Sequence, residues 1–152
     1  MKTRLENYFD RLWPLNRSIT GQGLRESLDI IGELVQLRRI EVSSGTPVFD
    51  WTVPLEWEVS QAYIKTPDGR IIANFAENNL HLVGYSIPFR AEMSLDDLKY
   101  YLHTLPEQPD AVPYITSYYG NTWGFCLMEI EYQALKPGIY KVVIDSVFTK
   151  GS

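Results

Sequence analysis

The segment EVSQAYIKTPDGRIIA, residues 58–73, has the pattern of a β-hairpin. Polar and apolar residues partly alternate over residues 58–65, as they do in a strand with one buried face. Pro67-Asp68-Gly69 then supplies residues that favour a tight turn, and Arg70-Ile71-Ile72-Ala73 follows. We therefore predict two antiparallel strands joined at this turn.

More strands are predicted further along the chain. Residues 114–119 and 122–127 flank Gly120-Asn121, which predicts a second hairpin. Residues 139–147 follow a Pro137-Gly138 turn and form an apolar run that is typical of a buried strand. Between these strands, the prolines of residues 104–113 exclude regular structure and predict an ordered surface loop.

Helices are predicted mainly at the start of the chain. Pro14 separates two groups of apolar residues at helical spacing, which are Leu5, Phe9 and Leu12, then Leu24, Leu28, Ile31 and Val35. A third helix is predicted over residues 94–102, with Ser94 as its N-cap and Asp97 at the capping-box position. A short helix is expected after residue 128. The fold class is therefore α+β, in three parts: residues 1–37, 38–128 and 129–152.

The composition narrows the range of functions. The chain has 152 residues, of which 45% are apolar, and no run approaches the ~20 apolar residues of a membrane span. The net charge of −5 and the scattered Lys and Arg residues speak against nucleic acid as a partner. No export signal is evident, and Cys126, the single cysteine, is expected to be a buried thiol. We therefore expect a cytoplasmic protein.

The two histidines are the first candidate binding residues. Neither His81 nor His103 belongs to a local metal-binding spacing, so no metal ligands are assigned. His81 is interpreted as a hydrogen-bonding residue on the polar face of a strand. His103 follows the predicted helix 94–102, where it either caps the helix or binds a ligand from the loop.

Aromatic side chains offer a second kind of site. Trp57, Tyr118 and Trp123 could stack on a sugar or a peptide if their rings are exposed, which would make the chain an independent binding module. The carboxylates near Trp51 and Trp57, which are Asp50, Glu56 and Glu58, are interpreted as solvated strand ends. A small hydrolase that uses His81 or His103 with Asp110 or Glu107 is a third hypothesis. No nucleophile motif is present, so no catalytic residue is assigned.

Several longer motifs resemble those of prokaryotic zinc-aminopeptidase-like proteins. They are LWPLNRSITG (12–21) with Arg25, VFDWTVP (48–54) with Glu56-Trp57, NLH (79–81) with Gly84-Tyr85-Ser86, HTLP (103–106) to Pro113-Tyr114, and Tyr118-Tyr119 with WGFC (123–126). The resemblance covers nearly the whole chain.

That resemblance implies an α/β aminopeptidase-like host domain interrupted near its amino terminus by a β-rich domain of unknown function. Residues 1–37 would be host helices, residues 38–128 the inserted domain, and residues 129–152 the return to the host. The ending Lys150-Gly151-Ser152 resembles a turn toward a further strand, so a fragment is expected. Members of the family that the chain resembles often accompany cell-surface polysaccharide biosynthesis genes.

The same resemblance implies the partners and cofactor of a longer parent protein. The inserted domain would cap the active site or mediate interaction, including homo-oligomers, and the parent would cleave a peptide-like substrate with zinc. The expected zinc ligands are not recognisable in this chain, and a zinc hydrolase needs about three protein ligands for each metal. The chain alone is therefore expected to hold no cofactor and to be inactive.

Overall fold

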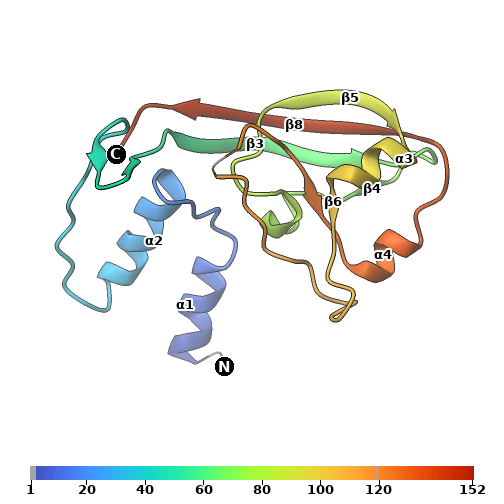
Figure 1. Cartoon of the computed structure of the whole chain (residues 1–152). Helices are drawn as coiled ribbons and strands as arrows, with labels where there is room; N and C mark the ends of the chain where they lie inside the picture. Colours follow the sequence, from blue (N-terminus) through green and yellow to red (C-terminus); the bar gives the residue numbers. More distant parts are fainter. Residues whose placement is uncertain (1–2, 119) are drawn as a thin grey trace. The chain divides into compact units, whose positions relative to one another are not determined.

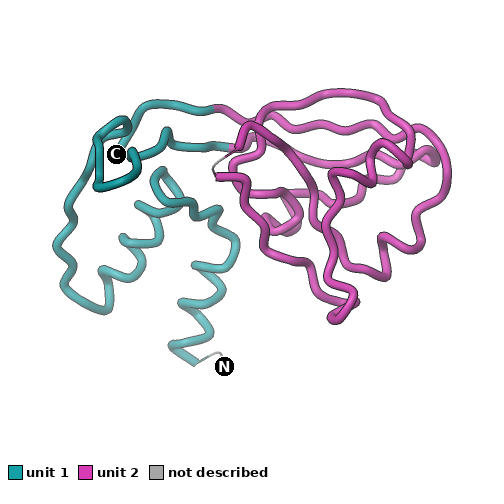
Figure 2. Tube along the Cα trace, viewed as in Figure 1, with its two compact units in different colours: residues 1–58, 148–152 teal, residues 59–147 magenta. Residues whose placement is uncertain are grey.

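The computed structural model describes residues 3–118 and 120–152 (Figure 1). Two compact units are distinguished in Figure 2: unit 1 runs to residue 58 and includes 148–152, and unit 2 is residues 59–147. These divisions differ from the predicted boundaries at residues 38 and 128. The difference arises because residues 129–147 supply a central strand of the sheet in unit 2, so they fold with that unit.

Unit 1 begins with the two predicted helices, α1 (Arg4–Leu12) and α2 (Gln22–Gly32). The Thr3 hydroxyl accepts a hydrogen bond from the Glu6 amide, and the Glu6 carboxylate accepts one from the Thr3 amide, which is a capping box. The helices contact each other, and Arg11 of α1 forms an ion pair with Glu33 directly after α2.

The rest of unit 1 contains a small hairpin of β1 (Pro47–Val48) and β2 (Trp51–Thr52). The last residues of the chain return beside it, where the Ser44 amide donates a hydrogen bond of 2.8 Å to the Gly151 carbonyl. The segment before the hairpin and the last residues of the chain, which are far apart in the sequence, are therefore held together.

Unit 2 contains most of a four-stranded sheet in the order β4-β3-β8-β5. The strands are β4 (Ile71–Ile72), β3 (Glu56–Lys65), β8 (Ile139–Thr149) and β5 (Phe89–Ser94). Ile64 pairs with Ile72 in antiparallel register, which confirms the predicted hairpin at residues 58–73. β5 pairs with β8 antiparallel over six residues, and the strand predicted at 139–147 is confirmed.

The second predicted hairpin is wrong. β7 (Phe125–Cys126) pairs in parallel with β6 (Leu102–His103). The segments 114–118 and 122–126 hydrogen-bond to a third segment: the Gly84 amide donates to Ile115, and the Val83 amide to Gly124. Segment 82–87 thus takes the backbone groups that a hairpin would have used; Tyr119, within the prediction, lies outside the described residues.

The short helices follow the predictions in part. Ser94 caps α3 (Leu95–Leu98), but a 3₁₀-helix, η2 (Lys99–Tyr101), continues it, and Leu102 is already in β6. The helix expected after residue 128 is α4 (Glu129–Gln133). His81 lies in a second 3₁₀-helix, η1 (Asn79–His81), so its predicted place in a strand is wrong.

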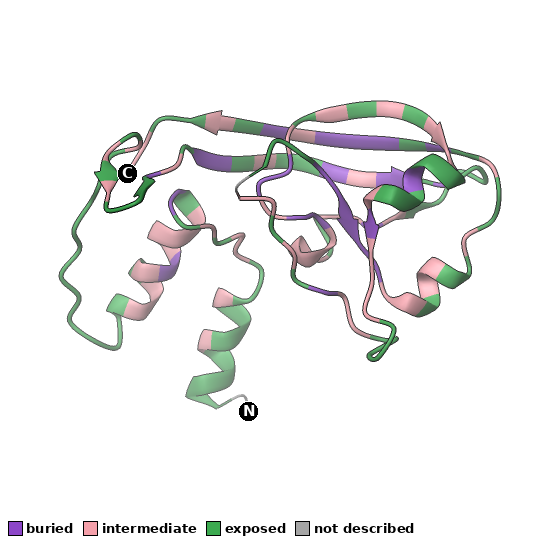
Figure 3. Ribbon diagram, in the orientation of Figure 1, coloured by how far each residue is buried: buried purple, intermediate pink, exposed green. Residues whose placement is uncertain are grey.

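The core lies in unit 2. Buried residues follow β3 and β8 and the segments packed against them (Figure 3). The largest fully buried side chains are Tyr140, Phe125, Ile64, Leu98, Leu127, Ile144, Val142 and Val143. Among the described residues, no helix is long and apolar enough to cross a membrane.

Candidate functional site

Both histidines lie beside Cys126. The Nδ1 atom of His81 is 2.8 Å from the Cys126 carbonyl oxygen, so this nitrogen carries the proton and donates. His103 is directly paired with Cys126 across the parallel β6–β7 ladder, and its own carbonyl accepts from the Leu127 amide at 3.0 Å. The two predicted binding residues therefore meet at one strand, and each has a structural contact there.

Burial shapes the chemistry of this strand. Desolvation lowers the pKa of His103, so its ring is neutral over a wider pH range than that of an exposed histidine. Desolvation also raises the pKa of the Cys126 thiol to about 12, which leaves almost no thiolate at neutral pH. Cys126 is fully buried, as predicted from the sequence. A thiol in this state is a packing residue and a poor nucleophile.

The predicted aromatic residues lie mostly inside the molecule. Trp123 is 6% exposed and is stacked between Phe89 and Tyr101, with ring centroids 4.1 and 4.0 Å away. Both faces of its indole are thus occupied by protein rings. Trp57 is 5% exposed, and Tyr118 makes an edge contact of 5.2 Å with the Tyr85 ring. Trp57 and Trp123 stabilise the fold, and stacking of either ring on a ligand would need the core to open. Tyr118 is half-buried.

The carboxylate of Glu56 is part of an ion pair in unit 1. Arg25 donates to its two oxygens at 2.7 and 2.9 Å, and the Ser152 amide donates at 2.9 Å. The hydrogen bonds from Arg25, followed by that from Ser152, lower the pKa of Glu56 against the opposing effect of desolvation. The interpretation of Glu56 as a solvated strand end is wrong, because its side chain is only 6% exposed.

Gly151 completes this ion-pair cluster. A Cβ atom at this position would lie 2.1 Å from the Glu56 Oε1 atom, so only glycine lets the backbone come this close to the carboxylate. Arg25 also donates to the Ser152 carbonyl at 3.1 Å. One ion pair therefore joins helix α2, the start of β3 and the last residues of the chain.

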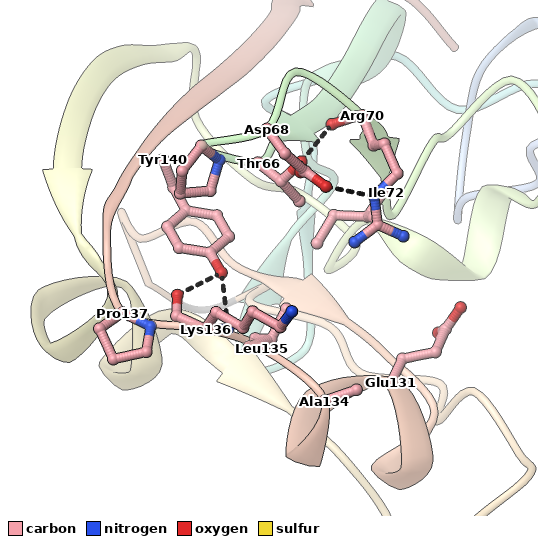
Figure 4. Close-up of a pocket in the computed structure, with 11 residues that line it drawn as sticks. Thr66, Asp68, Arg70, Ile72, Glu131, Ala134, Leu135, Lys136, Pro137 and Tyr140 are labelled. Carbon is pink, nitrogen blue, oxygen red and sulfur yellow. Dashed lines mark hydrogen bonds and ion pairs between the residues drawn. The ribbon is translucent and has the colours of Figure 1, made fainter.

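A cavity of about 360 Å³ lies entirely within unit 2 (Figure 4). One wall is the β3–β4 turn with Asp68 and Arg70, and the other is the segment after α4 with Leu135 and Lys136. Tyr140 lies between the walls, where its hydroxyl donates to the Lys136 carbonyl at 2.8 Å and accepts from the Lys136 amide at 3.2 Å.

The cavity contains both acidic and basic side chains. The Asp68 carboxylate accepts from the Thr66 hydroxyl and from Arg70 Nε, and these two bonds, that from Thr66 first, lower the pKa of Asp68. Lys136 and Arg70 bring positive charge from opposite walls. This site was not predicted from the sequence. The available signal was two turns, Pro67-Asp68-Gly69 and Pro137-Gly138, with Arg70 directly after the first and Lys136 directly before the second.

The His, Cys, Asp and Glu side chains do not form a metal-binding group among the described residues. In residues 3–118 and 120–152, no group of three or more His, Cys, Asp and Glu side chains could hold a metal ion. Glu107 and Asp110, proposed with the histidines for a hydrolase, are exposed in the loop before β7.

The chain is similar to one part of longer known proteins. Residues 56–147 match DUF2172, a domain of unknown function. A Clostridium acetobutylicum protein named "Putative polysaccharide biosynthesis protein with aminopeptidase-like domain" is 48% identical over 146 residues, covering 96% of this chain and 34% of the relative. The crystal structure of a "putative peptidase" from that organism has a TM-score of 0.89 and 48% identity, and the match covers 96% of this chain and 35% of that one.

These matches confirm the resemblance to aminopeptidase-like proteins in its broad form. The chain spans about a third of the length of the relatives that it matches. The DUF2172 match starts at Glu56 and ends at Val147, close to the limits of unit 2. This chain belongs to the DUF2172 family.

Proposed function

We propose that the chain is the amino-terminal part of an aminopeptidase-like protein. In this proposal unit 1 packs against the remaining domain, and unit 2 is an inserted domain that restricts access to the active site. The names of the relatives and the share of their length that this chain covers support the broad assignment. The observation that carries the docking of unit 1 is its exposed apolar surface.

Large apolar side chains are exposed along most of unit 1. They are Leu5, Phe9, Trp13, Ile19, Leu34, Val35, Leu37, Ile40, Val42, Phe49, Trp51 and Leu55. The rings of Phe9, on α1, and Trp13, at its C-cap, stack with their centroids 6.2 Å apart and remain 63% and 48% exposed. Apolar surface of this extent is typical of an interface. The remaining part of an aminopeptidase-like domain is the partner that best fits it.

The tip of the β1–β2 hairpin gives the same indication. Phe49 is fully exposed, and its backbone has a φ angle of 52°, which is unfavourable for a residue with a side chain. Backbone strain of this kind clusters at functional contacts. We infer that the Phe49 ring inserts into the remaining domain.

The topology of unit 2 supports its role as an insertion. The chain enters the unit along β3 and leaves it along β8, and these strands are neighbours in the sheet. Within unit 1, the hydrogen bond between Glu56 and the Ser152 amide holds the two connections together. Domains inserted into a host commonly have such adjacent ends.

Catalysis in this proposal belongs to the remaining domain. Any zinc would be held by residues beyond those described here, and the substrate would be peptide-like. The chain alone would be inactive and cytoplasmic. Unit 2 would act by shape, either by narrowing the approach to the active site or by contacts between two copies of the protein.

A deletion tests both roles. In the protein expressed from the complete coding sequence, residues 59–147 are replaced by an Asn-Gly turn, which the adjacent strands β3 and β8 can accommodate. We expect the protein to fold and to retain peptidase activity. The ratio of its cleavage rate on long peptides to that on short peptides should be higher than in the unaltered protein. Light scattering on the same samples measures the oligomeric state.

The outcomes separate the alternatives. A changed preference for peptide length supports restricted access. Dissociation of an oligomer with unchanged specificity supports an interaction role instead. No peptidase activity in the complete protein, or unchanged specificity and assembly after the deletion, would contradict the proposal.

A further inference from the structure

The cavity of unit 2 has hydrogen-bond donors that the described residues do not satisfy. No described side chain or carbonyl accepts from the exposed Lys136 ammonium. Arg70 uses its Nε for Asp68, and its side chain is 74% exposed, so its two terminal nitrogens face solvent and are open to a ligand. The carboxylates of the cavity, in contrast, already accept hydrogen bonds from the protein. Asp68 accepts from Thr66 and Arg70, and the Glu131 carboxylate accepts from the Met128 amide at 3.3 Å.

Because the donors are available and the acceptors are occupied, the cavity favours an anionic ligand. Acceptors that already have donors gain little from a cation, whereas the Lys136 ammonium and the terminal nitrogens of Arg70 gain a partner from an anion. The formal charges of Arg70, Lys136, Asp68 and Glu131 sum to zero, so a dianionic phosphate would face two carboxylates. A single carboxylate meets the available donors with less repulsion.

The position of the cationic wall is fixed by packing. Gly138 has a φ angle of 154°, and a Cβ atom there would lie 2.5 Å from Pro67 Cγ. The turn before β8 therefore closes directly on the β3–β4 turn. The buried Tyr140 hydroxyl makes two hydrogen bonds with the backbone of Lys136, which hold this residue at the cavity. The backbone of both walls is therefore in place before any ligand arrives, and the exposed side chains of Lys136 and Arg70 are ordered on binding.

Size and lining complete the description. A volume of about 360 Å³ is at the low end for ligand sites, which corresponds to a single sugar ring or amino-acid residue. Ile72, Ala134 and Leu135 contribute apolar surface next to the charged groups. This combination suits a compact molecule that has one acidic end and a less polar body.

We propose that the cavity between the β3–β4 turn and the segment after α4 binds a compact carboxylate through Lys136 and Arg70. Two sources share this chemistry: a sugar acid and the carboxyl terminus of a peptide. The site deepens the role proposed for unit 2, because it would let the inserted domain hold the acidic end of a substrate. It rests on unit 2 alone.

The test is a titration of the 15N-labelled chain of 152 residues followed by NMR. Glucuronate is compared with glucose, and N-acetylalanine with N-acetylalanine amide, each at concentrations to about 10 mM. We expect shifts in the amides of Ile72, Ala134 and Lys136 with at least one acid and not with its neutral counterpart. The acid that binds more tightly identifies the source as sugar or peptide.

Variants show which groups bind. Lys136→Met should weaken binding of that acid by at least about tenfold, and Arg70→Gln should weaken it similarly. Lys99→Met, at an exposed lysine on η2 that does not line the cavity, should bind as the unaltered chain does. Preserved shift dispersion shows that each variant is folded.

Three results would overturn the proposal: neutral compounds that bind as well as the acids, a Lys136→Met chain that binds normally, or no shifts from either acid. The titration needs neither the remaining domain nor peptidase activity. Its failure is therefore distinct from failure of the deletion experiment, and a negative titration leaves the proposed docking of unit 1 unaffected.

Discussion

Replacing Arg25 with methionine should lower the free energy of unfolding of unit 1 by about 3 kcal/mol, because it leaves a buried carboxylate without its cation. The Glu56 side chain is 6% exposed and loses two hydrogen bonds in this variant. The Ser152 amide remains as a donor, which places the estimate at the low end of the range for a broken buried pair.

The opposite substitution should be milder. Glu56→Gln keeps the shape and an acceptor for the Ser152 amide, and Arg25, whose side chain is 35% exposed, can be solvated. We expect a loss of about 1 kcal/mol. The double variant should be more stable than Arg25→Met alone, because it contains no unpaired charge. Urea unfolding followed by tryptophan fluorescence measures these effects, since Trp13, Trp51 and Trp57 all belong to unit 1.

The pH dependence gives the same pair a second test. The pKa of Glu56 is lowered in the folded chain, so its ion pair contributes stability above the ordinary carboxyl value of 4.5 and loses it as the pH falls through the lower folded value. The difference between the unaltered chain and Arg25→Met should therefore shrink below about pH 4.5. A cost for Arg25→Met below about 0.5 kcal/mol at pH 7 would refute this reasoning.

Three further substitutions or treatments test unit 2. Trp123→Ala should lower the free energy of unfolding by about 3–5 kcal/mol in thermal or urea unfolding, because it removes the middle ring of the stack in the core. The control Tyr114→Ala, at a ring 74% exposed, should change it by no more than about 0.5 kcal/mol. Equal effects would contradict the assigned packing. His103 has a lowered folded pKa, so the chain should lose stability as the pH falls from about 6.5, and His103→Gln should lack this loss in unfolding curves from pH 5 to 7.5. Cys126 should react with a thiol reagent only after unfolding, and rapid labelling of the folded chain at pH 7.5 would show that the thiol is accessible.

Local patterns in the sequence predicted the elements that depend on local chemistry. The helical spacing around Leu5 and Phe9 gave α1, Ser94 gave the start of α3, and Pro67-Asp68-Gly69 gave the first hairpin. Each of these signals acts within a few residues. The burial of Cys126 could also be predicted, because its apolar neighbours all belong to the core.

Contacts between distant segments could not be predicted in the same way. Segment 82–87 takes the hydrogen bonds expected between residues 114–119 and 122–127, and nothing near Gly120 signals this competitor. Glu56 looked solvated because its partners, Arg25 and Ser152, are 31 and 96 residues away. The candidate cavity could not be predicted for the same reason: Arg70 and Lys136 line one cavity only after β3 and β8 pair.

The docking of unit 1 is tested most directly by the accessibility of α1. A cysteine introduced as Phe9→Cys is labelled with a maleimide in the chain of 152 residues and in the protein expressed from the complete coding sequence. Tyr100→Cys, at a position 83% exposed in unit 2, serves as the control, and the buried Cys126 should stay unlabelled. We predict that Phe9→Cys reacts rapidly in the short chain and at least about tenfold more slowly in the complete protein, while Tyr100→Cys reacts rapidly in both. Equal rates for Phe9→Cys in the two proteins would contradict the proposal that the remaining domain covers α1.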